Sequence, residues 1–147
     1  RVSSGCMSSS ATRIRNRGPA NAFFITTYFR QSFAIDPSAL AGAASVTASL
    51  ERDDAAVFYL NGKELFRSSN LPAAPQPIAF DTLATGQAVE DTIDTFRIDP
   101  TNFVAGVNVF AVEIHQQSLS SSDISFNLEL VGTTGTTNAP TINIPPP

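Results

Sequence analysis

Hydrophobic and polar residues alternate with a period of two in four separate stretches of the chain. This is the spacing of side chains on one face of a β-strand, so each stretch predicts a strand with a buried face and a solvated face. A fifth stretch, residues 22–35, is rich in Phe, Ile, Thr and Tyr and ends at Asp36-Pro37, which is strand composition followed by a turn. The four alternating stretches are residues 44–51, 92–99, 107–116 and 124–131.

The strongest local signal is the segment AVFYLNGKELF, residues 56–66, in which Asn61 and Gly62 separate two apolar runs. These two residue types adopt the positive φ angles of a type I′ turn, which matches the twist of two paired strands. The segment therefore predicts a tight β-hairpin. Residues 68–91 are rich in Ser, Pro, Ala and Gly and predict a long loop with at most a short strand near residues 78–80.

The pattern as a whole predicts an all-β fold. No segment of ten or more residues has the spacing of an amphipathic helix, and the strands follow one another with loops of varied length. This pattern favours an antiparallel β-sandwich with a jelly-roll topology. The alternation also predicts a set of inward-pointing side chains, namely Phe58, Leu60, Phe110, Val112, Ile114, Phe126, Leu128 and Leu130.

Length and composition suit one globular domain. The 147 residues are 42% hydrophobic, and a chain of this size buries enough surface to fold without a disulfide or a metal. The longest apolar run is far shorter than the roughly 20 residues that cross a bilayer, so we expect no membrane span. The single cysteine, Cys6, excludes an internal disulfide and a cysteine-rich zinc site.

The net charge of −4 is unevenly spread along the chain. Residues 1–35 contain five Arg and no acidic residue, whereas residues 36–147 contain four basic and thirteen acidic residues. Because nucleic acid binding requires a concentrated basic face, we do not expect a nucleic acid partner. The sequence also lacks a Gly-rich phosphate loop and a CxxC pair, which leaves nucleotide and redox roles without support.

Both ends of the chain differ from its centre in composition. Residues 1–21 lack periodicity and predict an irregular lead-in to a β-sandwich domain over residues 22–131. Residues 132–147 are uncharged and rich in Thr and Pro, which is typical of an extended linker to a neighbouring domain. Alternatively, residues 141–144 alternate like a short strand, and self-association through this tail would make the chain a structural repeat unit of an extracellular assembly or adhesin.

Five polar residues lie at the strand positions that alternate with the predicted core residues, so their side chains point away from the core. Asn, Glu, His and Tyr side chains hydrogen-bond and stack with sugar rings, so these positions are candidate ligand-binding residues. A solvated sheet face is equally polar without any ligand. The chain has no Trp, which leaves Tyr28 and Tyr59 as its aromatic residues with a polar tip. The five candidates are Tyr59, Glu113, His115, Asn127 and Glu129.

His115 is the one histidine of the sequence and the natural base for any catalysis. Glu113 shares its parity, but residues two apart on a strand are separated by about 7 Å, which predicts no direct pair. The serines of residues 118–122 follow closely, without the Gly-x-Ser-x-Gly turn that presents a nucleophile. We therefore expect no catalytic residue in this chain.

Two strings carry a resemblance to a known superfamily. RDDAAVFYLNGKELFR and, later in the chain, NVFAVEIHQQSLSSSDISFNLELV resemble galactose-binding-like jelly-roll domains, over about residues 24–131. Within that superfamily the chain is similar to the β-sandwich domains of β-galactosidases and β-glucuronidases, which have a strand ending in YLNG. It looks still more like the β-sandwich accessory or carbohydrate-binding modules of secreted bacterial hydrolases.

The resemblance implies a noncatalytic accessory or carbohydrate-binding module of a larger secreted or extracellular protein, with carbohydrate or a neighbouring domain as its partner. It fixes no ligand, because domains of this fold bind sugars, lipids, nucleic acid or proteins, or only brace a catalytic domain. It also implies a structural Ca²⁺. Asp53, Asp54 and Asp91 precede strands and are the candidate ligands, since calcium prefers hard oxygen atoms; acidic turns that stay solvated are the alternative.

Overall fold

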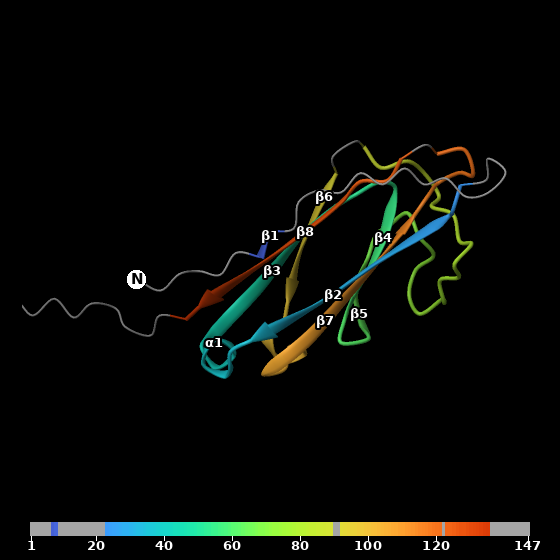
Figure 1. The fold of residues 1–147 in the computed structure, drawn as a ribbon. Helices are drawn as coiled ribbons and strands as arrows, with labels where there is room; N and C mark the ends of the chain where they lie inside the picture. The colour runs from blue at the N-terminus through green and yellow to red at the C-terminus, as the bar shows by residue number, and fades with distance from the viewer. Residues whose placement is uncertain (1–6, 9–22, 90–91, 122, 136–147) are drawn as a thin grey trace, which may run out of the picture.

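The computed structural model describes residues 7–8, 23–89, 92–121 and 123–135. Within these ranges two antiparallel four-stranded sheets face one another as a sandwich (Figure 1). The predicted all-β sandwich is therefore confirmed, while the jelly-roll topology stays a prediction. Most of the predicted lead-in, Cys6, Asp91 and the predicted strand of residues 141–144 lie outside the described residues.

Each sheet combines strands from distant parts of the sequence. The β8 sheet has the order β1-β8-β3-β6, and the β7 sheet has the order β2-β7-β4-β5. The strands of the β8 sheet are β1 (Met7–Ser8), β8 (Phe126–Thr134), β3 (Ala43–Arg52) and β6 (Ile93–Ile98). Those of the β7 sheet are β2 (Thr26–Ile35), β7 (Gly106–His115), β4 (Ala55–Leu60) and β5 (Lys63–Arg67).

The predicted strands between residues 22 and 131 are present, apart from the short one near residues 78–80, which is a loop. Strand β8 continues to Thr134, beyond the predicted domain boundary at residue 131. The predicted turn at Asp36-Pro37 opens a short helix, α1 (Pro37–Ala41), and a 3-10 helix, η2, covers Pro100–Asn102. The described residues contain no helix with the length and apolar character needed to span a membrane.

The main hydrophobic core fills the space between the two sheets. All eight side chains that the alternation predicts to point inward belong to it. Phe29 of β2 stacks on Phe126 of β8 with ring centroids 4.2 Å apart, and Phe58 of β4 meets the edge of Phe96 of β6 at 5.5 Å. These aromatic contacts join one sheet to the other, because each pair takes one ring from each sheet.

The β4–β5 hairpin turns at Asn61 and Gly62, with φ angles of 52° and 81°. The Asn61 backbone N–H donates to the Val109 carbonyl at 2.8 Å, and the Asn61 side-chain oxygen accepts the Val109 N–H at 2.9 Å. The turn residue that the sequence supplies for its conformation thus also ties the hairpin to β7.

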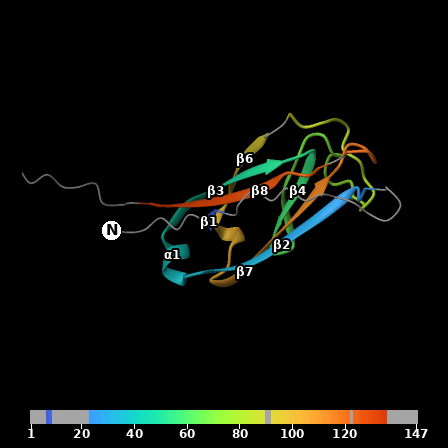
Figure 2. The same ribbon diagram turned by 45° about the horizontal axis from the view of Figure 1, so that its top comes forward.

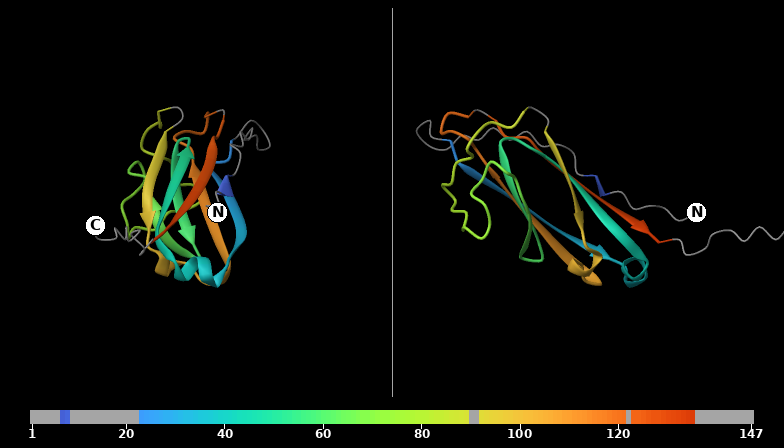
Figure 3. Two further views of the ribbon diagram at one scale, coloured as in Figure 1. Left: turned by 90° about the vertical axis from the view of Figure 1, so that its left-hand side faces the viewer. Right: turned by 180° about the vertical axis from the view of Figure 1, so that it is seen from behind.

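Loops from three connections gather at one end of the sandwich, and α1 lies at the other end (Figure 2). Figure 3 shows the long segment between β5 and β6 beside the loop between β7 and β8 at that end. Residues 68–88 of the long segment pack on the face of the β7 sheet that turns away from the main core. A second apolar cluster forms there, with Ala55, Val57, Leu71 and Ala84 buried and Tyr59 and Ile78 packed against it.

Candidate functional site

We call the side of the β7 sheet that turns away from the main core the outer face. Cross-strand register places Tyr28 opposite Glu113, and both Arg30 and Tyr59 opposite Ala111. Residues directly opposite one another point to the same face, with Cβ atoms about 4.5–5.5 Å apart. Side chains from β2, β7 and β4 are therefore neighbours on this outer face.

His115, at the end of β7, joins three parts of this face. Its Nδ1 lies 2.9 Å from the Thr26 hydroxyl of β2 and 2.9 Å from the Thr82 carbonyl of the 68–88 segment. Its Nε2 lies 3.1 Å from the Glu113 carboxylate. Thr26 in turn donates to the Phe80 carbonyl at 2.6 Å. The imidazole thus holds the long segment against the sheet.

The structure confirms one expectation about His115 and contradicts another. Its parity does point it away from the main core, but its exposed fraction is 0% because residues 68–88 fold over it. We expected no direct pair between His115 and Glu113, and this expectation is wrong. The two side chains extend toward one another along the strand, so that the imidazole and the carboxylate are in contact. His115 is therefore a buried structural contact beside the exposed surface, not part of it.

Tyr59 and Glu113 form a polar pair on the outer face. Tyr59 and Glu113 lie on the same outer face, and burial together with the negative charges of Glu113 and Glu64 raises the pKa of Tyr59 to about 12. Partial burial and the Glu113 charge also raise the pKa of Tyr28. Both phenol groups consequently keep their protons at neutral pH and are able to donate hydrogen bonds.

Arg67 of β5 borders this pair and anchors the long segment. Its Nε and Nη2 donate to the two carboxylate oxygens of Glu64 at 2.8 and 2.7 Å. Its Nη1 donates to the Pro72 and Gln76 carbonyls at 2.6 and 2.8 Å. The guanidinium is thus fully engaged in structural contacts.

Two aromatic rings are exposed near these polar groups. Tyr28 is 60% exposed and Phe80 is 74% exposed. Both lie close to Thr26, since Tyr28 has the same strand parity two residues further along β2 and the Phe80 carbonyl accepts the Thr26 hydroxyl. The sequence patterns did not indicate Phe80 as a site residue. A large aromatic residue in a loop rich in Pro and Ala is the signal that could have done so, because such loops lie at the surface.

The structure separates the remaining two candidate ligand residues from this surface. Asn127 and Glu129 are on β8, opposite Glu51 and Ser49 of β3, and so belong to the β8 sheet. They have the predicted parity away from the core, but that parity points to the other side of the sandwich. Tyr59 and Glu113 therefore lie together, whereas Asn127 and Glu129 do not join them.

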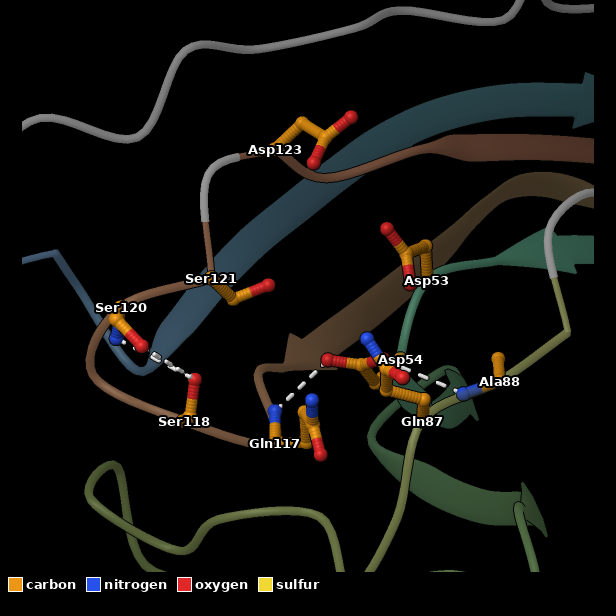
Figure 4. A pocket seen from close by; sticks show the side chains of 9 residues that line it. All are labelled: Asp53, Asp54, Gln87, Ala88, Gln117, Ser118, Ser120, Ser121 and Asp123. Atoms are coloured by element: carbon orange, nitrogen blue, oxygen red, sulfur yellow. Dashed lines mark hydrogen bonds between the residues drawn. The ribbon is translucent and has the colours of Figure 1, made fainter.

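A pocket, which we call the loop pocket, lies among the loops at one end of the sandwich (Figure 4). It has a volume of about 340 Å³. One oxygen of Asp54 accepts the Ala88 N–H at 3.2 Å, and the other accepts the Gln117 N–H at 2.8 Å. Asp54 therefore ties loops from three connections together. The lining residues are Asp53, Asp54, Gln87, Ala88, Gln117, Ser118, Ser120, Ser121 and Asp123.

The described residues of the loop pocket do not fit a calcium ion. Both carboxylate oxygens of Asp54 are occupied by backbone N–H groups. The described part of the chain holds no group of three or more His, Cys, Asp or Glu side chains that could hold a metal. Asp91, the third candidate ligand, lies outside the described residues. Calcium binding stays a prediction.

Comparisons with known proteins bear on the fold. A scan of protein-family models finds no match, and a search of curated proteins finds none. Among solved structures, the chain is similar to part of a native α-L-rhamnosidase from Aspergillus terreus, with a TM-score of 0.51, 12% identity, 86% of this chain covered and 14% of that chain. A β-D-mannosidase from Dictyoglomus thermophilum has a TM-score of 0.41 and 18% identity, with 61% of this chain and 9% of that chain covered. This chain thus spans a small part of either enzyme, and the rhamnosidase shares its β-sandwich fold.

Proposed function

We propose that this chain is a noncatalytic accessory module of a larger secreted or extracellular protein and that it binds carbohydrate on the outer face of the β7 sheet. One observation carries the proposal: the exposed ring of Tyr28 lies opposite Glu113 on the face that also holds Tyr59, and the exposed Phe80 belongs to the segment whose carbonyl accepts the Thr26 hydroxyl. The rings supply apolar surface, and the polar pair supplies a hydroxyl and a carboxylate held in place.

This combination suits a sugar ring for a physical reason. A pyranose has C–H groups that pack on aromatic rings and hydroxyl groups that need directed hydrogen-bond partners. Exposed apolar side chains that lie together in a patch rimmed by polar groups are typical of a binding surface. The buried His115 holds the Phe80 segment and Glu113 in one arrangement. A ligand would therefore meet a surface that is already ordered.

The noncatalytic part of the proposal has separate support. His115 has an exposed fraction of 0%, and its two ring nitrogens contact Thr26, Thr82 and Glu113. A general base must reach a proton of the substrate, and the buried ring of His115 is not accessible to a substrate. The occurrence of the same fold within an α-L-rhamnosidase, of which this chain spans 14%, supports the proposed accessory role in a larger protein.

A binding experiment with matched variants tests the proposal. We expect isothermal titration with oligosaccharides chosen from a glycan array to give measurable binding by the unmodified chain. Tyr28→Ala and Phe80→Ala should each weaken it about tenfold, since stacking contributes about 1–1.5 kcal/mol per ring. Ile93→Ala is the control, because Ile93 is also 60% exposed but lies on β6 of the other sheet. Equal weakening by all three variants, or no binding to any glycan, would contradict the proposal.

A further inference from the structure

The charged groups on the strands of the outer face differ in how they are satisfied. Arg67 is held by both oxygens of Glu64, and the Glu113 carboxylate lies 3.1 Å from the His115 ring. Arg30 of β2 is exposed, and its side chain has no hydrogen bond or ion pair with any residue that the structure describes. Among these groups, the Arg30 guanidinium is thus the one whose donors face solvent.

Arg30 lies next to a position with a small side chain on the outer face. It lies opposite Ala111 of β7, and Ala111 lies opposite Tyr59 of β4. Neighbouring strands are about 4.8 Å apart, so the backbones of Arg30 and Tyr59 are separated by about 10 Å. Between them only the methyl group of Ala111 rises from the sheet. Tyr28 and Glu113 form the next row, about 7 Å along the strands.

The negative charges nearest to Arg30 contact another group or lie farther away. The Glu113 side chain is only 20% exposed and lies 3.1 Å from the His115 ring. Asp81 follows Phe80, whose carbonyl contacts Thr26. Thr26 is four residues from Arg30 along β2, a distance of about 13 Å, which exceeds the screening length of about 8 Å at physiological salt. A ligand over Ala111 therefore meets Arg30 as its nearest unpaired charge.

We infer that the carbohydrate bound on the outer face is an acidic one, with its carboxylate or sulfate group held by Arg30 while its ring lies over Ala111 between Arg30 and Tyr59. This inference rests on the proposed function. The planar fork of a guanidinium matches carboxylate and sulfate oxygens in a two-point contact. Tyr28 packs on the sugar ring, and the Tyr59 hydroxyl and the Glu113 carboxylate hydrogen-bond to its hydroxyl groups.

Titration calorimetry with two matched ligand pairs tests the inference. One pair is a hexuronate tetramer and its carboxyl-reduced counterpart; the other is a sulfated galactan tetramer and its desulfated counterpart. We expect at least one acidic member to bind about ten- to a hundredfold more tightly than its neutral counterpart, because hydrogen bonds to charged groups have that effect on affinity. The pair that shows the preference identifies carboxylate or sulfate as the group recognised.

Charge variants then locate the preference. Arg30→Gln should remove the preference, so that the acidic and the neutral ligand bind with the same affinity. Arg97→Gln is the matched control, since Arg97 is also exposed but lies on β6 of the β8 sheet. Circular dichroism spectra that match the unmodified chain confirm that both variants are folded.

The outcomes separate this inference from the proposed function. Binding that depends on Tyr28 but shows equal affinity for acidic and neutral ligands overturns the inference and leaves the proposed function standing. Equal losses in Arg30→Gln and Arg97→Gln also overturn it, because the preference would then come from overall charge. No binding to any of the four ligands, with no glycan bound on the array, contradicts the proposed function and the inference with it.

Discussion

Replacing His115 by Ala should loosen the long segment from the β7 sheet and lower the free energy of unfolding. The ring has an exposed fraction of 0% and contacts Thr26, Thr82 and Glu113. Removing it leaves the Thr82 carbonyl without this partner and opens a cavity where the imidazole was. We expect the segment to open more often than in the unmodified chain.

The size of the loss follows from the groups left behind. An unsatisfied buried polar group costs about 1–3 kcal/mol. Glu113 contributes at the low end, because its side chain is 20% exposed and can be solvated. Adding about 1–2 kcal/mol for the cavity gives a loss on the order of 3 kcal/mol. Domains of this size have stabilities of about 5–15 kcal/mol, so the variant should remain folded, with a Tm lower by about 6–12 °C.

Urea unfolding followed by circular dichroism at pH 7 measures the loss. His115→Asn and His115→Gln are informative controls, because the shorter amide reaches the Nδ1 position near Thr82 and the longer one reaches the Nε2 position near Glu113. Both should be more stable than His115→Ala. Limited chymotrypsin digestion should cleave after Phe80 faster in His115→Ala than in the unmodified chain. A loss below about 1 kcal/mol, with unchanged cleavage at Phe80, would refute the role of His115 in holding the segment.

Three further predictions concern the hairpin, the core and alkaline pH. Phe58→Ala should cost about 3–5 kcal/mol in urea unfolding, because Phe58 is fully buried against Phe96, and a loss below about 1 kcal/mol would count against this core. Gly62→Ala should cost about 1–2 kcal/mol through its φ of 81° alone, since no atom lies within 4 Å of the added Cβ; equal stability would show that the turn relaxes. The pKa of Tyr59 is raised from 10.0 to about 12, so its protonated form is favoured by folding; the resulting stability is present below pH 10 and is lost as pH rises toward 12. The free energy of unfolding should therefore fall more steeply across that pH range for the unmodified chain than for Tyr59→Phe. Equal falls in both would contradict the raised pKa of Tyr59.

The strands could be predicted because each presents one face to the core. Along β7, Phe110, Val112 and Ile114 point inward and Ala111 and Glu113 point outward, and this alternation is visible in the sequence. The β4–β5 hairpin could be predicted because only a few residue pairs adopt its turn without strain. Local rules of this kind need no knowledge of which strands are neighbours.

The candidate site depended on information that alternation lacks. Parity shows that Glu113 and Asn127 point away from the core, but the sheet order decides that they lie on opposite sides of the molecule. The burial of His115 depends on a segment with no periodicity, whose path is fixed by contacts such as that of Arg67 with the Gln76 carbonyl. The exposure of Phe80 comes from the same segment. Sheet order and loop path are tertiary properties, which a period-two pattern does not contain.

Amide chemical shifts measured during titration with an oligosaccharide that binds test the central claim most directly. If the outer face of the β7 sheet is the binding surface, the largest shifts should fall on Tyr28, Arg30, Ala111 and Phe80, and they should saturate together with one affinity. Shifts confined to the β8 sheet around Asn127, or to the loop pocket, would place the ligand elsewhere and contradict the account.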